Sequence, residues 1–205
     1  MATQKIPRLL TPDQYLERER NAEEKHEFLD GRIYAMSGGS PAHSTITVNL
    51  TAEVRAKLKG KPCQAFSNDM KVSAESGRLY AYPDLSVVCG TPRFQDEHGD
   101  VLRNPRAIFE ILLPSTEAYD RGRKFERYQQ IASLTDYVLI AQDRPRIEHY
   151  ARQPDNRWIL TIVTELPSSL MIASVGCELM LAEIYDRVEF AAEAEDDSMP
   201  EQIRA

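Results

Sequence analysis

Apolar positions recur along the chain at two spacings, and each spacing predicts a different kind of element. Ile46, Leu50, Val54 and Leu58 return every fourth position until Gly60, a pattern typical of an amphipathic helix with one buried face. Short apolar runs separated by loops that contain Gly or Pro predict strands instead. We predict strands over residues 63–67, 70–73, 84–89, 107–112, 137–141, 147–151 and 158–164, and we expect the first four to form the core of one sheet.

Local signals near the start of the chain define a further helix and a hairpin. The stretch from Thr11 to Gln14 combines an N-cap residue, a proline at the first helical position and a glutamine three residues after the cap. It predicts a helix that runs to about Asn21. Asp30 and Gly31 predict a tight turn that joins two short strands over residues 27–29 and 32–36.

The second half of the chain alternates helical and extended segments. A helix is predicted over residues 117–131, capped by Ser115 or Thr116, and a last short helix over residues 179–188. Residues 37–41 predict a flexible loop, and the residues after Phe190 have the composition of a solvated tail. We expect residues 1–190 to form one domain of the mixed α/β (α+β) class, followed by an acidic flexible tail over 191–205.

Composition and charge narrow the class of protein further. Of the 205 residues 42% are hydrophobic, which is enough for a packed core that needs neither disulfides nor a structural metal. The formal charge is −7, and the six acids and one arginine after position 188 account for −5 of it. The acidic balance argues against a general nucleic-acid coat protein, because such proteins carry a basic face, although the first 188 residues, at −2, are nearly neutral.

Two further expectations concern location and cysteine chemistry. Apolar runs stay far below the roughly 18 residues that cross a bilayer, and the first residues lack the apolar stretch of a secretory signal. We therefore expect a cytoplasmic protein with no membrane partner. Cys63, Cys89 and Cys177 are odd in number and widely spaced, so we expect three reduced residues of the core.

Glu110 is the most informative candidate for chemistry. It lies within the apolar run from Ala107 to Leu113, which predicts a buried strand. A buried unpaired carboxylate costs several kcal/mol, so it requires an ion-pair partner, a proton or a metal ion. A structural salt bridge is the alternative to a functional role.

Asp84 is a second carboxylate at an unusual place. It follows Pro83 and opens the strand predicted over residues 84–89, where an acid contributes little to packing. Asp84 and Glu110 could share a divalent cation, because hard oxygen ligands suit Mg²⁺ or Mn²⁺. Such ions bind through one or two carboxylates and complete their shell with water and a substrate phosphate. An ordinary turn aspartate is the alternative.

Lys124 is a third candidate, because the chain can bring it level with Glu110. Three residues of strand follow Glu110 and seven residues of helix precede Lys124, about 10 Å in each case. A tight reversal at residues 114–116 therefore brings the two side chains level. Asp120, Lys124 and Tyr128 follow at intervals of four and line one helix face. The alternative is a surface lysine paired with Asp120.

These candidates occur within a set of motifs that resembles a known family. The order and spacing are similar to those of the Uma-two group of bacterial proteins, which is classed in the PD-(D/E)XK, or restriction-endonuclease-like, nuclease superfamily. The resemblance covers about Leu10 to Val188. It rests on Leu10 to Leu16, Glu27 to Gly31, His43 ahead of a helix, Tyr82 to Asp84, Phe109 to Leu112, Pro114 to Thr116, and Asp120 to Tyr128 with Lys124.

The resemblance implies a restriction-endonuclease-like fold, in which helices flank a central mixed sheet, and a metal-dependent endonuclease. Asp84 and Glu110 would bind Mg²⁺ or Mn²⁺, which lowers the pKa of a water molecule. Lys124 would orient that water or offset charge while a phosphodiester bond is hydrolysed. The usual lysine of the superfamily stands two residues after the glutamate, where this chain has Leu112, so the role passes to Lys124.

Glu27 and His43 match two further positions of the family. Glu27 is implied as an additional ligand or an acid–base group, and pairing with Lys25 or Arg32 is the alternative. His43, which follows a glycine loop at the start of a helix, is a candidate for a phosphate contact or for a plain capping or surface role. We expect the other histidines to be ordinary surface residues: His26, His98 and His149.

Nucleic acid is the expected partner, with DNA favoured over RNA. A local set of basic residues would hold its backbone or would form only a solvated helix face: Arg103, Arg106, Arg121, Arg123, Lys124 and Arg127. Two other functions stay open, a non-catalytic nuclease-fold protein that binds nucleic acid or a protein partner, and a hydrolase of other phosphate esters. The strands predicted after Asp136 offer an edge through which a homodimer could pair.

Overall fold

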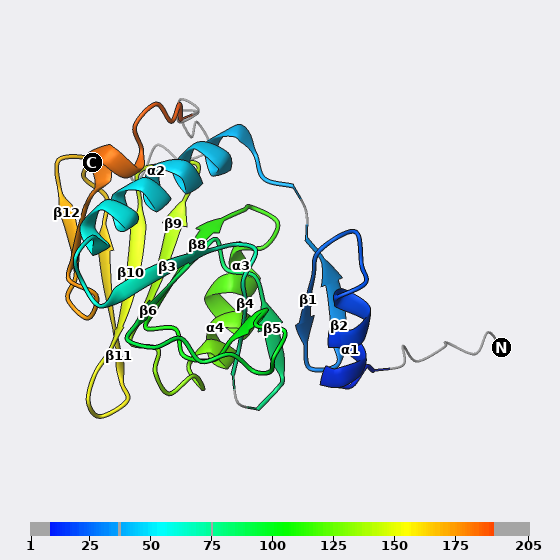
Figure 1. The fold of residues 1–205 in the computed structure, drawn as a ribbon. Coiled ribbons are helices and arrows are strands. Elements are labelled where there is room, and N and C mark those ends of the chain that lie inside the picture. The colour runs from blue at the N-terminus through cyan, green and yellow to red at the C-terminus, as the bar shows by residue number, and fades with distance from the viewer. Residues whose placement is uncertain (1–8, 37, 75, 191–205) are drawn as a thin grey trace, which may run out of the picture.

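The structure of the protein is a computed structural model that describes residues 9–36, 38–74 and 76–190. These residues form two mixed sheets with helices packed against them, which confirms the predicted mixed α/β class (Figure 1). The tail predicted over 191–205 and Ser37 of the predicted loop lie outside the described residues.

The larger sheet contains most of the predicted strands. Its order is β11-β10-β9-β8-β6-β3, and β8 pairs with β9 in parallel while the other neighbours are antiparallel. Continuous apolar sequence is typical of central strands that are buried on both faces. The strands are β3 (Cys63–Ser67), β6 (Leu85–Cys89), β8 (Ala107–Leu112), β9 (Asp136–Ala141), β10 (Ile147–Arg152) and β11 (Trp158–Val163).

The smaller sheet has the order β2-β1-β5-β4-β7, with β4 and β7 parallel. The expectation that residues 70–73 join the other three early strands in one core is wrong, because β4 pairs with β5 and β7. Strands β5 and β7 are too short for their pattern to be recognised. The bounds are β1 (His26–Leu29), β2 (Arg32–Ala35), β4 (Lys71–Ser73), β5 (Leu79–Ala81) and β7 (Val101–Leu102).

The N-terminal helix and hairpin form as predicted. In helix α1 (Pro12–Glu19) the Thr11 side chain accepts a hydrogen bond from the Gln14 backbone, and the Gln14 side chain accepts one from the Thr11 backbone. This is a capping box. Asp30 and Gly31 have φ angles of 49° and 87°, as the type I′ turn between β1 and β2 requires.

Two layers cover the two faces of the larger sheet. Helix α2 (Pro41–Leu58) covers one face, where its four-residue apolar stripe packs with Phe109 and other buried residues of β6 and β8 (Figure 1). On the other face, Ile108 and Leu112 pack with helix α4 (Phe125–Tyr128) and with the smaller sheet. Because side chains alternate along a strand, Glu110 shares the α4 side with Ile108 and Leu112.

The helix predicted over residues 117–131 is interrupted and shorter. Helix α3 (Glu117–Tyr119) passes into a π-helical turn, η1 (Asp120–Lys124), and α4 ends at Tyr128. Arg152 explains this end, because its guanidinium donates hydrogen bonds to the carbonyls of Gln129 and of Ile131, the latter at 3.0 Å. Those carbonyls are therefore satisfied without a further helical turn.

The last predicted helix, over residues 179–188, is also shorter. A hairpin of β12 (Ser169–Ile172) and β13 (Cys177–Met180) precedes it, and only a single turn, α5 (Leu181–Ile184), is helical. In β13 the buried side chains alternate with exposed ones, which is the period of a strand.

Two of the three cysteines are bonded to each other, so the expectation of three reduced residues is wrong. Cys63 and Cys89 are directly opposite in the β3–β6 ladder and form a disulfide. Cys177 is free and buried, as expected. The bonded pair is invisible in the sequence because it depends on the register of two strands.

Candidate active site

Glu110 lies in the middle of β8, where only 4% of its surface is exposed. The Tyr128 hydroxyl donates a hydrogen bond to its Oε1 at 3.0 Å. Burial raises the pKa of Glu110 well above its ordinary value, and the nearby carboxylates of Asp120, Asp84 and Glu27 add to this although Lys124 acts in the opposite direction. The carboxyl group is thus buried with more negative than positive charge around it.

Lys124 lies among three of these carboxylates. Its Nζ is 2.8 Å from Glu110 Oε1, 2.9 Å from Glu27 Oε1 and 3.4 Å from Asp120 Oδ1. Burial alone would lower the pKa of Lys124, but Glu110 and Glu27 outweigh it and hold the pKa well above its ordinary value. The alternative of a surface lysine paired only with Asp120 is therefore wrong.

The π-helical turn explains how Lys124 and Asp120 reach the sheet together. The Thr116 hydroxyl donates to Asp120 Oδ2 at 3.0 Å, and the Tyr137 hydroxyl of β9 donates to the Asp120 carbonyl at 3.1 Å. These bonds anchor the turn against the sheet at both its side chain and its backbone. The tight reversal predicted before this helix is present, and Asp120, Lys124 and Tyr128 face Glu110 as their spacing predicted.

Glu27 reaches the cluster from the other sheet. It lies on β1 with 8% of its surface exposed, and the Tyr82 backbone N–H donates to its Oε1 at 3.2 Å. Its predicted alternative partner Lys25 instead contacts Asp69. The contact of Glu27 with Lys124 therefore joins the smaller sheet to the helix that packs on the larger one.

Asp84 borders the cluster and is held in a different way. Its Oδ2 accepts a hydrogen bond from the Ile111 backbone at 2.7 Å, which extends the pairing of β6 with β8 by a side chain. Its Oδ1 lies 3.3 Å from His43 Nε2. His43 is thus neither a cap nor a surface residue, because it contacts Asp84 from the first turn of α2. Asp84 also acts on the pKa of Glu110, which places the two carboxylates in one electrostatic environment.

Two acid–histidine contacts, one buried and one partly buried, were not predicted from the sequence. His149, expected on the surface, is buried on β10, and its Nε2 lies 2.8 Å from Asp136 Oδ1. His26 is partly buried and bonds to Glu19, while His98 is exposed as expected. The contact between Asp136 on β9 and His149 on the neighbouring strand β10 gives no sequence signal, because it depends on how the two strands pair.

Half of the six residues in the predicted basic patch are neutralised by close acidic partners. Arg121 donates two hydrogen bonds to Glu148, and Arg127 donates one to Asp30 at 2.9 Å. Arg123 differs, because its side chain is 60% exposed and its contact with Asp30 is 3.6 Å long. Lys124 is buried in the carboxylate cluster. The patch therefore offers far less positive charge than the sequence suggests.

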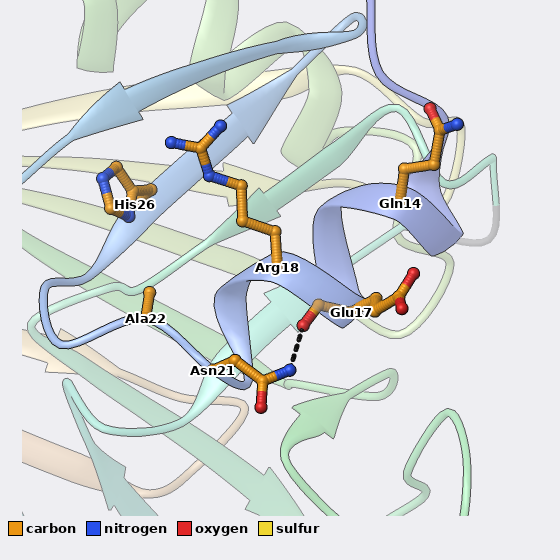
Figure 2. A pocket seen from close by; sticks show the side chains of 6 residues that line it. All are labelled: Gln14, Glu17, Arg18, Asn21, Ala22 and His26. Atoms are coloured by element: carbon orange, nitrogen blue, oxygen red, sulfur yellow. Dashed lines mark hydrogen bonds between the residues drawn. The ribbon is translucent and has the colours of Figure 1, made fainter.

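A surface hollow lies beside α1, apart from the carboxylate cluster. Figure 2 shows its side chains with one hydrogen bond among these residues, from Asn21 Nδ2 to the Glu17 carbonyl. It contains none of the predicted site residues, so we assign it no role in the chemistry. Its lining comprises Gln14, Glu17, Arg18, Asn21, Ala22 and His26.

Across the described part of the chain, each helix is too short or too polar to span a bilayer.

The fold matches that of a solved protein described as a "putative nuclease belonging to DUF820" from Anabaena variabilis ATCC 29413. The TM-score is 0.71 at 18% identity, over 86% of this chain and 97% of that one. The two proteins therefore share a fold.

The chain belongs to the Uma2 family, which confirms the resemblance to the Uma-two group. The family model, described as "Putative restriction endonuclease", matches residues 12–182. Two relatives from Synechocystis sp. (strain ATCC 27184 / PCC 6803 / Kazusa) agree with this. "Uncharacterized protein slr1290" is 36% identical over 88% of this chain and 94% of its own length, and "Uncharacterized protein sll1609" is 36% identical over 78% and 89%.

Proposed function

We propose that this Uma2 protein is a metal-dependent endonuclease that hydrolyses phosphodiester bonds of nucleic acid. The single observation that carries the proposal is the buried contact of Lys124 with both Glu110 and Glu27, next to Asp84. A protein that only needs stability gains little from such a cluster, because replacing a buried ion pair by apolar residues is often neutral or stabilising. Acids and a lysine kept in one buried place point to chemistry.

The charges and donor atoms of the cluster fit a divalent cation. Glu27, Asp84, Glu110 and Asp120 carry four negative charges when ionised, against the single positive charge of Lys124. Within residues 9–36, 38–74 and 76–190 no three His, Cys, Asp or Glu side chains are gathered as a preformed metal site. Mg²⁺ and Mn²⁺ do not need one, because they bind through one or two carboxylates and keep several waters.

Each residue has a distinct proposed role. Asp84 and Glu110 hold the Mg²⁺ or Mn²⁺ ion, which when bound polarises the phosphate and lowers the pKa of a water molecule. Lys124 offsets negative charge that develops on the phosphate or orients the attacking water, and Glu27 keeps its ammonium group in place at 2.9 Å. Because the pKa of Glu110 is raised, protons compete with the ion for this carboxylate, so ion affinity rises with pH.

DNA is favoured over RNA as the substrate because the family description names a restriction endonuclease. A second candidate is a nuclease-fold protein that binds nucleic acid or a protein partner without cleaving it. The engagement of Arg121 and Arg127 by acidic partners favours the protein-binding form of this candidate, since it leaves less positive charge to hold a nucleic-acid backbone.

Calorimetry with MnCl₂ tests the proposal. We expect the wild type to bind Mn²⁺, and the variants Asp84→Asn and Glu110→Gln to lose binding and cleavage of plasmid or single-stranded circular DNA together. Asp136→Asn is the matched control, since it removes a buried carboxylate that lies outside the cluster. Circular dichroism confirms that each variant is folded. A folded wild type that binds no ion, even with DNA present, would overturn the proposal and favour the non-cleaving candidate.

A further inference from the structure

Tyr34 presents an aromatic ring to solvent beside the candidate site. It lies on β2, one of the two edge strands of the smaller sheet, and is 41% exposed. In the β1–β2 ladder it stands directly opposite Glu27. Residues opposite each other in an antiparallel pair project from the same face of the sheet, with Cβ atoms about 5 Å apart. The Tyr34 ring therefore stands next to the carboxylate that contacts Lys124.

Tyr119 supports this ring from the helix side. The two ring centroids are 6.2 Å apart with an interplanar angle of 35°. The Tyr119 ring is also 5.9 Å from Lys124 Nζ. The pair thus covers the Glu27–Lys124 contact, with Tyr34 outermost and Tyr119 behind it.

The buried position of the Tyr119 hydroxyl is not explained by hydrogen bonding. Its hydroxyl oxygen is buried and has no hydrogen-bond partner among the described residues. A buried hydroxyl without a partner lowers stability, so polar contacts do not account for a tyrosine here. What the residue supplies at this place is a flat ring that backs Tyr34.

Arg123 adds an exposed positive charge on the helical segment that carries Tyr119. It follows Tyr119 by four residues, within the π-helical turn η1. Its side chain is 60% exposed, and its contact with Asp30 is longer than a hydrogen bond. Arg127, one turn further on, is only 13% exposed and is held by the same aspartate at 2.9 Å. Arg123 is thus the better placed of the two to meet a phosphate.

We propose that Tyr34, backed by Tyr119, stacks an unpaired nucleobase beside the scissile phosphodiester, while Arg123 binds an adjacent phosphate. Aromatic rings combined with a basic side chain are the usual means of holding single strands, because every base has a face that can stack. In a duplex both faces of a base are already covered by neighbouring bases. The preferred ligand is therefore single-stranded or locally opened nucleic acid. This inference rests on the proposed function for the position of the phosphodiester but not for the binding itself.

Binding of a 12-nucleotide single strand that contains 2-aminopurine, measured in EDTA, tests the inference without cleavage. We expect quenching of the probe by the wild type and by Tyr34→Phe, and loss of quenching with a ~5- to ~100-fold rise in Kd for Tyr34→Ala. Phe94→Ala is the matched control, since Phe94 is similarly exposed at 39% and lies outside the candidate site. We also expect the matching duplex to bind more weakly than the single strand.

The outcomes separate this inference from the proposed function. Quenching that depends on Tyr34 supports the inference even if the wild type binds no metal and cleaves nothing. A Tyr34→Ala protein that binds the single strand as the wild type does, or a wild type that binds no single strand, overturns the inference. In both cases Mn²⁺ binding and DNA cleavage by the wild type still decide the proposed function independently.

Discussion

Replacing Lys124 with methionine should cost the protein a large part of its stability. Methionine keeps much of the aliphatic volume, so the main change is the loss of the ammonium group that contacts Glu27, Glu110 and Asp120. At 2.8 Å, one such pair is worth roughly 6 kcal/mol of Coulomb energy at an effective dielectric constant of about 20. Relief from burying the ammonium offsets part of this. The expected net loss in unfolding free energy at pH 8 is about 3 to 5 kcal/mol.

The loss caused by Lys124→Met should also depend on pH. The pKa of Glu110 is already raised in the folded protein, and removal of the lysine that lowers it raises it further. The folded variant then binds a proton at Glu110 more tightly than the unfolded chain does. Such a group stabilises the fold below its ordinary pKa, and this stabilisation is lost as the pH rises through the folded-state pKa. The deficit relative to wild type should therefore be smaller at pH 5 than at pH 8.

Urea denaturation followed by circular dichroism at pH 5, 6.5 and 8 measures both effects, with Lys71→Met as the matched control. Lys71 is equally buried and lies 2.9 Å from Asp100. Arg20 donates two hydrogen bonds to Asp100 and, together with Lys71, holds its pKa well below the usual range. Asp100 keeps Arg20 in the control variant, so we expect a smaller loss that does not vary between pH 5 and 8. Equal losses in both variants, without a pH dependence, would refute the reasoning.

Three further predictions concern other parts of the molecule. Tyr119→Phe should leave the unfolding free energy unchanged or raise it by up to about 1 kcal/mol, because the lost hydroxyl has no hydrogen-bond partner among the described residues. Urea denaturation measures the change, and a clear loss of stability would contradict the prediction. Asp136→Asn should cost about 1.5 to 3 kcal/mol at pH 7, because it removes the carboxylate that accepts hydrogen bonds from His149, Ser174 and Thr135. The cost should be smaller below pH 4, because these hydrogen bonds lower the pKa of Asp136 in spite of its burial; a pH-independent cost would contradict this. Reduction of the Cys63–Cys89 disulfide should lower the unfolding free energy by roughly 3 to 4 kcal/mol, as calculated from its 26-residue separation. Urea denaturation with and without dithiothreitol measures this loss, and an unchanged unfolding midpoint would contradict the prediction.

The parts of the fold that were predictable are those encoded locally. The four-residue spacing that ends at Leu58, the capping box at Thr11 and the turn at Asp30 each need only a few neighbouring residues, and each formed as predicted. Strands of five or six residues with continuous apolar sequence were also found. Strands β5 and β7, of three and two residues, are too short to show a pattern, and the strand predicted at β4 was assigned to the wrong sheet because its partners depend on pairing.

The candidate site was predictable to the extent that buried charge is conspicuous in an apolar run. Glu110 stood out for this reason, and strand and helix lengths were enough to bring Lys124 level with it. The contact of Glu27 with Lys124 could not be derived from spacing, since it depends on how two sheets pack; only the family resemblance pointed to Glu27. The chemical roles of all these residues stay predictions, including those of Asp84 and His43, which the structure places in contact.

The cluster is assembled from distant parts of the chain, and this has a consequence during synthesis. A growing polypeptide that has emerged from the ribosome through β6 already contains Glu27 and Asp84, but it lacks Glu110 and Lys124. The carboxylates and the lysine meet only when β8 and the helix after it are complete and packed on both sheets. Nascent or partly unfolded chains therefore carry no assembled centre, so any reactivity it has toward the cell's own nucleic acids arises only in finished, folded molecules.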